Sequence, residues 1–153
     1  MSEARRIPAD SPAALWVVDA MWREVQEIYP EIPGATSPSA TPADFSPPGG
    51  CFVALYDDGH LVAGGGIKRL DDGAGEIKRM YVVPEARGRG LARELLAALE
   101  DAARDLGYRC VRLDTGDKQP HAEALFRSTG YREIGNYNGN DYASFWGEKD
   151  LAG

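Results

Sequence analysis

The segment Arg87-Gly88-Arg89-Gly90-Leu91-Ala92 has the composition of an anion-binding turn. Glycines at its second and fourth positions leave the backbone open to a phosphate, and its two arginines can add charge-assisted hydrogen bonds. The segment stands between a predicted strand and a predicted helix. At such a position, the free N–H groups of the first helical turn and the helix dipole both favour a bound anion. Taken alone, the same residues are also compatible with a tight turn that carries two solvated arginines.

The sequence excludes two other kinds of phosphate-binding loop. A P-loop ends in Gly-Lys-Ser/Thr, and no such ending is present. A dinucleotide-binding fingerprint needs a third glycine at position 93, which is Arg93 here. Asp114 lies near the distance expected for the acidic residue of that fingerprint, but without the third glycine the match fails.

The elements on either side of this segment are predicted from hydrophobic patterning. Residues 76 to 83 read as a strand that Pro84 ends, and Gly90 to Leu106 reads as a helix. Gly107 is placed for a left-handed helix cap. One face of the helix is expected to be buried and to consist of Leu91, Leu95, Leu99, Ala102 and Leu106. The opposite face is expected to carry Arg93, Glu100, Arg104 and Asp105.

The N-terminal half predicts an edge strand, a helix and a hairpin. Arg5 to Pro8 is the edge strand, and Asp10 or Ser11 caps a helix that ends before Pro30. The buried stripe of that helix is expected to be Leu15, Val18, Trp22, Val25 and Ile28. Residues 30 to 50 are irregular because of their prolines. The hairpin has strands at 51 to 56 and from 61 onward, and Gly64-Gly65-Gly66 indicates a bulge or a close backbone approach.

The remaining elements complete a mixed α/β fold. A strand is predicted at 110 to 115, a helix at 121 to 128, and two closing strands around 131 to 134 and 142 to 146, with a loop at 136 to 140. The order β-α-ββ-β-α-β-α-β-β predicts one domain over residues 1–153. Its mixed central sheet is expected to have helices on both faces.

Composition limits the classes of partner and the location of the chain. The 153 residues carry a formal net charge of −7, and the pI is about 4.8. An acidic chain with no dense Lys/Arg run is a poor candidate for binding nucleic acid or an anionic membrane. Cys51 and Cys110 match no metal-ligand spacing, so no metal is expected. No apolar run suits a signal peptide or a membrane span, so we expect a soluble, cytoplasmic protein.

With these elements in place, the sequence resembles the GNAT N-acetyltransferases. Arg87 to Ala92 fits their motif Gln/Arg-x-x-Gly-x-Gly/Ala after a central strand, and the element order agrees over nearly the whole chain. The runs Glu76 to Val82 and Thr115 to Pro120 are similar to a bacterial subgroup of small-molecule type. The resemblance implies an acetyl-CoA-dependent enzyme that moves an acetyl group to a primary amine by direct attack in a ternary complex. The acceptor is expected to be a small molecule or an amino acid, because nothing suggests an extended peptide groove.

The resemblance also implies roles for individual residues. The strand before the loop would offer backbone groups to the pantetheine and the thioester carbonyl, and the amide near Val82 would stabilise the oxyanion. The loop would hold the diphosphate, and Gln119 stands where many members have an asparagine that bonds the pantetheine arm. The implied cofactor-binding residues are Met80, Tyr81, Val82, Arg87, Gly88, Arg89, Gly90, Leu91, Ala92 and Gln119.

Acetyl transfer needs a neutral amine, and alkylamines are mostly protonated at pH 7. By the resemblance, Glu76 is the candidate general base, acting directly or through water. The alternative is a strand-end carboxylate paired with Lys78 or Arg132. Position 126 holds a phenylalanine where many members have a tyrosine that protonates the departing thiolate. The tyrosines that could substitute for it are Tyr131, Tyr137 and Tyr142.

Two further questions stay open at the level of sequence. Because a phenyl ring donates no proton, Phe126 is also compatible with a second hypothesis. In that hypothesis the chain is a GNAT-fold module that senses acetyl-CoA without turnover. Lys78 and Arg79 could meet an acceptor carboxylate or simply pair with the acidic surface, and strand alternation places them on opposite faces, so that at most one reaches the site. The fold is also compatible with a homodimer formed through the final strands.

Overall fold

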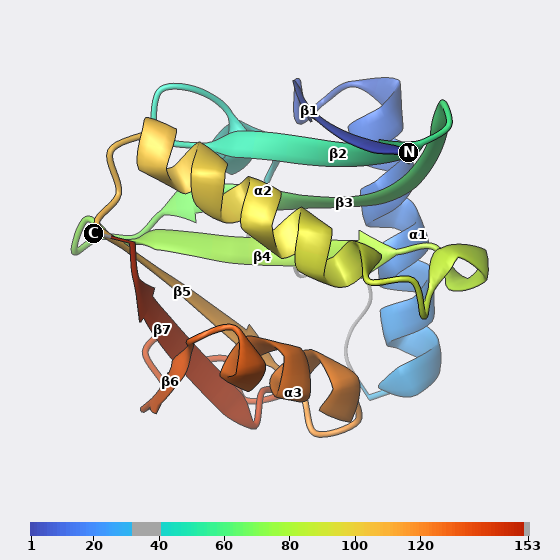
Figure 1. The fold of residues 1–153 in the computed structure, drawn as a ribbon. Coiled ribbons are helices and arrows are strands. Elements are labelled where there is room, and N and C mark those ends of the chain that lie inside the picture. The colour runs from blue at the N-terminus through green and yellow to red at the C-terminus, as the bar shows by residue number, and fades with distance from the viewer. Residues whose placement is uncertain (32–40, 152–153) are drawn as a thin grey trace.

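The backbone of the protein is organised around one seven-stranded sheet with the strand order β1-β2-β3-β4-β5-β7-β6 (Figure 1). The computed structural model describes residues 1–31 and 41–151. The strands are β1 (Ser2–Ile7), β2 (Cys51–Asp57), β3 (His60–Arg69), β4 (Gly75–Val82), β5 (Cys110–Thr115), β6 (Arg132–Ile134) and β7 (Phe145–Asp150). Among the described strands, β4 and β5 pair in parallel, and the other neighbours are antiparallel.

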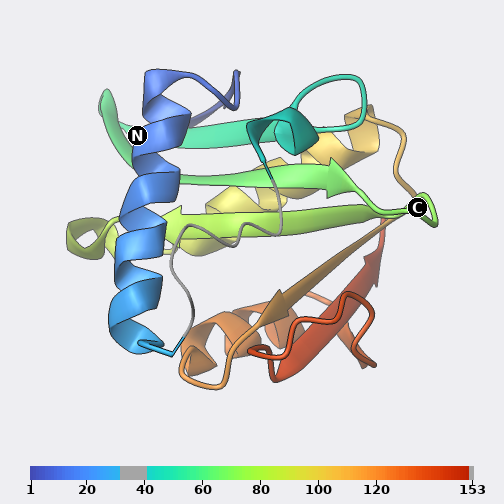
Figure 2. The same ribbon diagram turned by 180° about the vertical axis from the view of Figure 1, so that it is seen from behind.

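Helices cover both faces of this sheet, as the sequence predicts. The helices are α1 (Pro12–Ile28), α2 (Leu91–Asp105) and α3 (Pro120–Ser128), with short 3-10 turns η1 (Pro42–Phe45) and η2 (Pro84–Ala86). Helix α2 crosses the front face in Figure 1, and α1 crosses the back face, which Figure 2 presents. The mixed sheet and the predicted order of elements are confirmed. Residues 32–40 of the predicted irregular segment lie outside the described residues.

Helix α1 begins as predicted, but its buried side is rotated from the predicted stripe. The Ser11 hydroxyl caps the helix by accepting a hydrogen bond from the Ala14 amide at 3.4 Å. The buried residues are Ala14, Val17 and Met21, whereas Leu15 is 48% exposed, so its place in the predicted stripe is wrong. The physical reason lies in the sheet, because a Cβ at Gly64 would contact Val17 at 3.0 Å. The helix therefore docks through small residues onto a strand that lacks side chains there.

The glycine run in β3 fulfils both roles predicted for it. The pairing register shifts between Gly64 and Gly66, so that Gly65 stands opposite two residues of β4, Arg79 and Met80. This is a β-bulge, and Arg79 has the left-handed φ of 61° that such irregularities often contain. Gly66 also allows a close approach, since a Cβ there would collide with the buried ring of Phe45.

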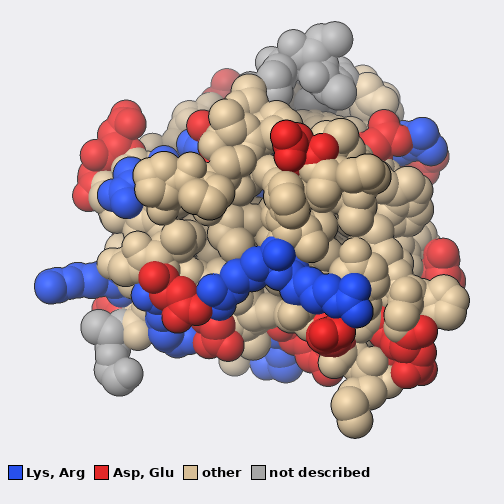
Figure 3. Space-filling model, turned by 90° about the horizontal axis from the view of Figure 1, so that it is seen from above, with Lys and Arg blue, Asp and Glu red and all other residues tan. Residues whose placement is uncertain are grey.

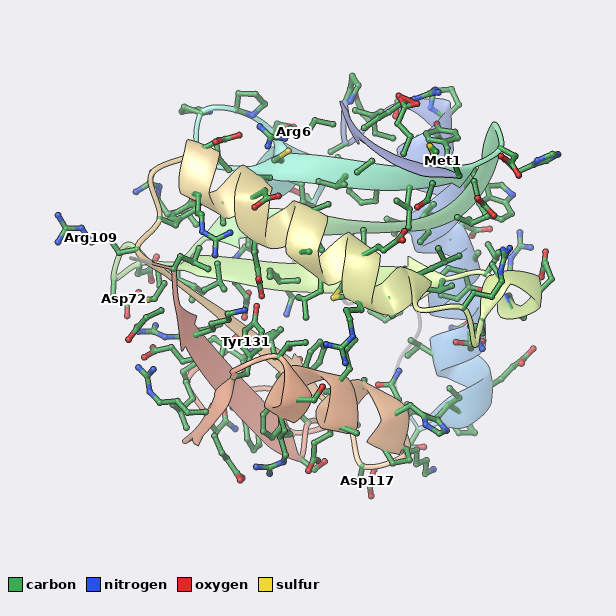
Figure 4. All side chains as sticks on the ribbon, viewed as in Figure 1. Met1, Arg6, Asp72, Arg109, Asp117 and Tyr131 are labelled. Carbon is green, nitrogen blue, oxygen red and sulfur yellow. The ribbon has the colours of Figure 1, made fainter. Side chains whose placement is uncertain are left out.

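Helix α2 buries most of its predicted face and one residue that was predicted to be exposed. Leu91, Leu95, Leu99 and Ala102 are buried, and Gly107 has the predicted left-handed conformation at the helix end. Glu100 is only 6% exposed, which contradicts the prediction. Its carboxylate accepts hydrogen bonds from the Tyr131 hydroxyl at 2.7 Å and from Lys149 Nζ at 3.0 Å. Tyr131, which Figure 4 labels, lies just before β6, and Lys149 lies in β7. Both donors compensate the buried charge of Glu100.

The last strand lies a few residues later than predicted. Strand β7 begins at Phe145 rather than at Tyr142, and it pairs with both β5 and β6. The preceding residues are held instead by turn contacts. The Tyr142 amide donates to Asn140 Oδ1 at 3.1 Å, and the Ser144 amide donates to the Thr115 carbonyl at 2.9 Å. Asparagine side chains that bond the backbone in this way favour turns over ladders.

Charges of both signs are interspersed on the face that lies above β1 and β2 in Figure 1 (Figure 3). Among the helices of the described residues, none combines the length and the apolar character needed to cross a bilayer. The described part of the chain also contains no group of three or more His, Cys, Asp or Glu side chains that could hold a metal ion.

We expect the substitution Tyr131→Phe to lower the free energy of unfolding by about 1–3 kcal/mol, because the buried Glu100 carboxylate loses a donor. Burial, reinforced by Glu100, raises the pKa of the Tyr131 hydroxyl in the folded state. In the unfolded state this hydroxyl ionises near its ordinary pKa of about 10, so its stabilising effect is complete below that pH and is lost as the pH rises above it. Urea denaturation of both proteins from pH 7 to pH 11 measures this difference.

The matched control for this experiment is Tyr56→Phe, whose hydroxyl makes no hydrogen bond among the described residues. A Tyr131→Phe variant as stable as Tyr56→Phe at pH 7, or a stability difference that grows above pH 10, would contradict the assigned network.

Candidate active site

Strands β4 and β5 enclose a cavity because they separate soon after they begin. They pair only through Gly75 with Val111 and Glu76 with Arg112, and then diverge toward the right in Figure 1. Between them lies a cavity of about 750 Å³. Its walls come from the C-terminal half of α1, the end of β3, β4, β5, α3 and the loop that precedes β7. Segments far apart in the sequence thus meet around one space.

Glu76 lines this cavity and is almost completely buried, with 3% of its surface exposed. Its Oε2 atom accepts hydrogen bonds from the Tyr137 hydroxyl at 2.6 Å and from Asn138 Nδ2 at 3.1 Å. Lys78 Nζ lies 3.8 Å from Oε1, whereas Arg132, the other predicted partner, pairs with Glu148 and Asp150. The carboxylate is therefore held in a fixed orientation by neutral donors on one oxygen.

A second carboxylate, Asp114 of β5, is connected to Glu76 through one side chain. Asn138 Nδ2 donates to Asp114 Oδ2 at 2.6 Å as well as to Glu76, and Asn140 Nδ2 reaches the same Asp114 atom at 3.2 Å. Trp146 Nε1 donates to Asn138 Oδ1 at 3.1 Å and fixes the amide from the other side. Asn138 is thus the centre of a network that spans the gap between the two strands.

This network was not anticipated from the sequence, which indicates only a loop at residues 136 to 140. Asparagine and glycine are frequent in turns for local reasons, so their abundance in the loop already has an explanation. The sequence signal for the network is the run Asn136-Tyr137-Asn138, in which a tyrosine stands between two asparagines shortly before a strand. That signal becomes informative only when the loop is known to fold back over β4 and β5.

The three tyrosines considered as substitutes at Phe126 have different environments. Phe126 itself is buried in the cavity wall. Tyr131 is committed to Glu100 and does not line the cavity, which removes it as a candidate. Tyr137 lines the cavity, but burial and the neighbouring Glu76 raise the pKa of its hydroxyl, so it holds its proton firmly. Tyr142 lines the cavity as a 43% exposed side chain and stays a candidate.

The C-terminal end of α1 is joined to the far side of the cavity. The buried Tyr29 hydroxyl accepts a hydrogen bond from the Lys118 amide at 3.0 Å, and Lys118 Nζ donates to the Ile28 carbonyl at 3.1 Å. Gly116 makes this approach possible, since a Cβ there would collide with Tyr29. Next to this contact, Gln119 lines the cavity and accepts a hydrogen bond from the Thr115 hydroxyl at 3.3 Å.

The β-bulge changes the positions of Lys78 and Arg79. Both residues line the cavity, so the prediction that at most one reaches the site is wrong. A regular strand would place consecutive side chains on opposite faces, but the extra residue opposite Gly65 cancels that alternation. Desolvation lowers the pKa of the half-buried Arg79 guanidinium, which lies 5.3 Å from the Phe45 ring centre.

The Arg87–Ala92 segment lies beyond the end of β4, outside the cavity lining, at the start of α2. Gly88 and Gly90 have φ angles of 83° and 77°, a conformation that glycine adopts without strain. Gly90 is the N-cap of α2 and provides no side chain to cap it, so the first-turn amides stay available for an anion. Arg87 pairs with Glu24 at 2.7 Å and Arg89 pairs with Asp57 at 3.0 Å.

The predicted cofactor-binding residues are therefore distributed over two places. Met80 and Gln119 line the cavity together with Glu76. Tyr81 and Val82 continue β4 toward the glycine turn, where Arg87 Nε donates to the Val82 carbonyl at 2.9 Å and the Arg87 guanidinium lies 5.5 Å from the Tyr81 ring centre. Strand β4 is thus the element that connects the cavity to the glycine turn.

Comparisons with known proteins agree on one family. The sequence model of the acetyltransferase (GNAT) family matches residues 18–131. The chain is 38% identical to the IAA acetyltransferase of Azospirillum brasilense over 103 residues, which cover 65% of this chain and 67% of that protein. The chain thus matches about two thirds of the length of this curated relative.

Solved structures with the same fold cover nearly the whole chain. A Klebsiella pneumoniae protein assigned to the acyl-CoA N-acyltransferases superimposes with a TM-score of 0.77 and 28% identity, over 99% of each chain. The N-acetylglutamate synthase of Neisseria gonorrhoeae, solved with coenzyme A and N-acetyl-glutamate, gives a TM-score of 0.74 at 21% identity. That match covers 99% of this chain and 35% of the synthase.

Asn138 donates to two carboxylates, and substitutions of this residue test that bridge. We expect Asn138→Ala to lower the free energy of unfolding by about 1–3 kcal/mol, because Glu76 and Asp114 lose a common donor. Asn138→Asp, which has nearly the same shape, should be more destabilising at pH 7, since it places a third negative charge between them.

The two variants are compared by urea denaturation at several pH values. The stability difference between them should narrow as the pH falls and the introduced carboxyl group takes up a proton, which the two neighbouring carboxylates make easier than for an isolated aspartate. Equal stabilities of Asn138→Ala and Asn138→Asp at pH 7 would show that Asn138 does not bridge the two carboxylates.

Proposed function

The chain belongs to the acetyltransferase (GNAT) family, and we propose that it transfers an acetyl group to the primary amine of a small molecule or amino acid by direct attack in a ternary complex. It is an N-acetyltransferase, and acetyl-CoA is its co-substrate. The observation that carries the proposal is the buried Glu76 carboxylate, which lines a cavity between two separating strands and is oriented by Tyr137 and Asn138.

In the proposed reaction, Glu76 accepts the proton that the amine must lose, directly or through one water molecule. The amine nitrogen then forms a bond to the thioester carbonyl carbon, and the carbon–sulfur bond breaks. The nitrogen loses its second proton and the departing thiolate takes one up, so that the products are an amide and the thiol of coenzyme A. Because Tyr137 and Asn138 already occupy Oε2, the oxygen left to meet the amine is Oε1, the one nearer to Lys78.

We propose that no buried tyrosine replaces the missing acid at Phe126. The Tyr137 hydroxyl donates to Glu76 and its pKa is raised, so it orients the base rather than releasing its own proton. An ordinary thiol has a pKa of about 8.5, so the departing sulfur needs only modest help. Water, or the exposed Tyr142 hydroxyl, is sufficient for that step.

We assign the diphosphate of acetyl-CoA to the Arg87–Ala92 segment at the start of α2. The open space at Gly88 and Gly90, the uncapped first turn and the helix dipole support this assignment. The same strand that holds Glu76 would carry the pantetheine arm along Met80, Tyr81 and Val82, with Gln119 facing it across the cavity. Arg87 now pairs with Glu24, and Arg89 pairs with Asp57. To bind the diphosphate, each arginine would have to leave its carboxylate or contact the carboxylate and the phosphate together.

We also propose that residues 1–153 act as a single catalytic domain in the cytoplasm. The acidic composition, and the mixed charges of the face seen in Figure 3, support a small-molecule acceptor over a nucleic acid or a membrane.

The principal test of the proposed function is Glu76→Gln, which preserves the shape and the two hydrogen bonds of the side chain. We expect kcat to fall about 10²- to 10⁴-fold, because the amine loses its general base. Acetyl-CoA affinity, measured by calorimetry, should stay within a factor of about two, which is the scatter expected when no contact is lost. Thiol release over a panel of primary amines provides the rate.

The matched control is Glu100→Gln, a buried glutamate with a tyrosine and a lysine partner that lies outside the cavity. It should keep the wild-type kcat as long as it stays folded. If Glu76→Gln turns over as fast as this control, the base assignment is wrong. Stabilisation of the wild type by acetyl-CoA with no turnover of any amine would favour a sensor over an enzyme.

A separate test addresses the diphosphate. We expect Gly90→Val to weaken coenzyme A binding by about tenfold or more, because a β-branched residue strains a left-handed N-cap and covers the amides. Gly107→Val introduces a comparable strain at the opposite end of α2, away from the proposed contact, so it controls for general destabilisation. Calorimetry with coenzyme A should separate the two variants. Equal affinities would place the diphosphate elsewhere.

A further inference from the structure

Arg112 of β5 stands beside Glu76, but its ion pairs are with other carboxylates. The two residues are neighbours at the point where β4 and β5 are hydrogen-bonded. The Arg112 guanidinium donates from Nε to Glu148 Oε2 and from Nη1 to Asp72 Oδ2, each at 2.6 Å. Its side chain is only 20% exposed. One carboxylate from β7 and one from the turn before β4 therefore hold the guanidinium in one place.

A further contact of Arg112 is with the ring of Tyr137. The guanidinium carbon lies 5.6 Å from the ring centre, within the range of a cation–π contact. The hydroxyl at the far end of this ring donates to Glu76 Oε2 at 2.6 Å. Burial and Glu76 raise the pKa of that hydroxyl, and the charge of Arg112 opposes this rise. Arg112 is therefore connected to the carboxylate of Glu76 through one aromatic ring.

The ring of Tyr137 depends on such contacts because residues 135–144 form a loop between β6 and β7. Asn136 Oδ1 accepts hydrogen bonds from the two backbone amides that follow Tyr137, at 3.2 and 2.8 Å. These bonds fix the backbone, but they leave the side-chain torsions of Tyr137 free to choose among rotamers. The orientation of the ring is then determined by Arg112 at its face and Glu76 at its hydroxyl.

We propose that Arg112 is a positioning residue for the general base, because it holds the Tyr137 ring in the orientation from which the hydroxyl fixes Glu76. The proposal rests on the proposed function, in which Glu76 takes the proton of the amine. A direct ion pair between Arg112 and Glu76 would compete with the amine for the carboxylate. Because Asp72 and Glu148 engage its Nη1 and Nε atoms, the guanidinium acts on Glu76 through the ring instead.

The first measurement compares Arg112→Gln with Arg127→Gln by thiol release over the panel of amines. Arg127 is a matched control, because it pairs with two carboxylates, lies 4.7 Å from the Phe145 ring centre and does not line the cavity. We expect Arg112→Gln to lower kcat about tenfold, the order of effect of a partly desolvated cation–π contact. The dissociation constant of acetyl-CoA should change less than about twofold. Arg127→Gln should keep the wild-type kcat.

A double-mutant cycle with Tyr137→Phe distinguishes positioning from a general structural role. Phenylalanine keeps the ring beside Arg112 and removes only the hydroxyl that reaches Glu76. In the Tyr137→Phe background, Arg112→Gln should lower kcat by less than about twofold, because both changes remove the same interaction. Losses that multiply would overturn the proposal. Arg112→Lys keeps the charge without the planar fork, so it should give an intermediate kcat, and it serves in the same cycle if Arg112→Gln does not fold.

Two outcomes separate this inference from the proposed function. If Glu76→Gln keeps the wild-type kcat, the base assignment fails and the positioning role fails with it. If Glu76→Gln loses turnover while Arg112→Gln keeps it, the base assignment stands and only the positioning role is refuted.

Crystal structures of Arg112→Gln and Arg127→Gln test the same contact without an acceptor. The Tyr137 hydroxyl should leave hydrogen-bond distance of Glu76 in Arg112→Gln and should stay there in Arg127→Gln. An unchanged hydrogen bond in both variants would refute the positioning role, whatever the effect on kcat.

Discussion

Strands β4 and β5 are hydrogen-bonded only at their first residues, and the remaining features of the site depend on their separation. Parallel strands that diverge leave backbone polar groups without a ladder partner, and such groups must be satisfied by side chains, water or a ligand. The loop before β7 spans part of the gap with side chains, because Tyr137 and Asn138 donate to the Glu76 carboxylate and not to the β4 backbone. The cavity exists because the two halves of the sheet are bridged by side chains rather than by backbone.

The two buried glutamates, Glu76 and Glu100, have similar partners, but only Glu76 lines the cavity. Glu100 and Glu76 each accept a hydrogen bond from a tyrosine hydroxyl, and each has a lysine nearby. Lys149 lies 3.0 Å from Glu100, whereas Lys78 lies 3.8 Å from Glu76. The first pair is a closed contact inside the core. The second is looser and faces a cavity, which leaves the carboxylate oxygen nearer to the lysine open to a substrate.

The sequence predicts the elements well because their signals are local. Leucine spacing in α2, the glycine turn at its start and Gly107 at its end all depend on neighbouring residues. The errors concern long-range contacts. The burial of Glu100 depends on Tyr131 and Lys149, and the shared face of Lys78 and Arg79 depends on a bulge opposite Gly65. The Asn138 network joins residues from three separate segments, and no single segment of the sequence contains it.

Helix α2 begins at the glycine turn and carries Glu100, the anchor of the second half of the sheet, at its tenth position. One added residue would rotate the following positions by about 100°, and Glu100 would then face away from Tyr131 and Lys149. The spacing between the turn and Glu100 therefore cannot change by one residue without loss of the hydrogen bonds to Tyr131 and Lys149. Changes in chain length during evolution should consequently be confined to the turns, and α2 should keep its length even where its sequence has diverged.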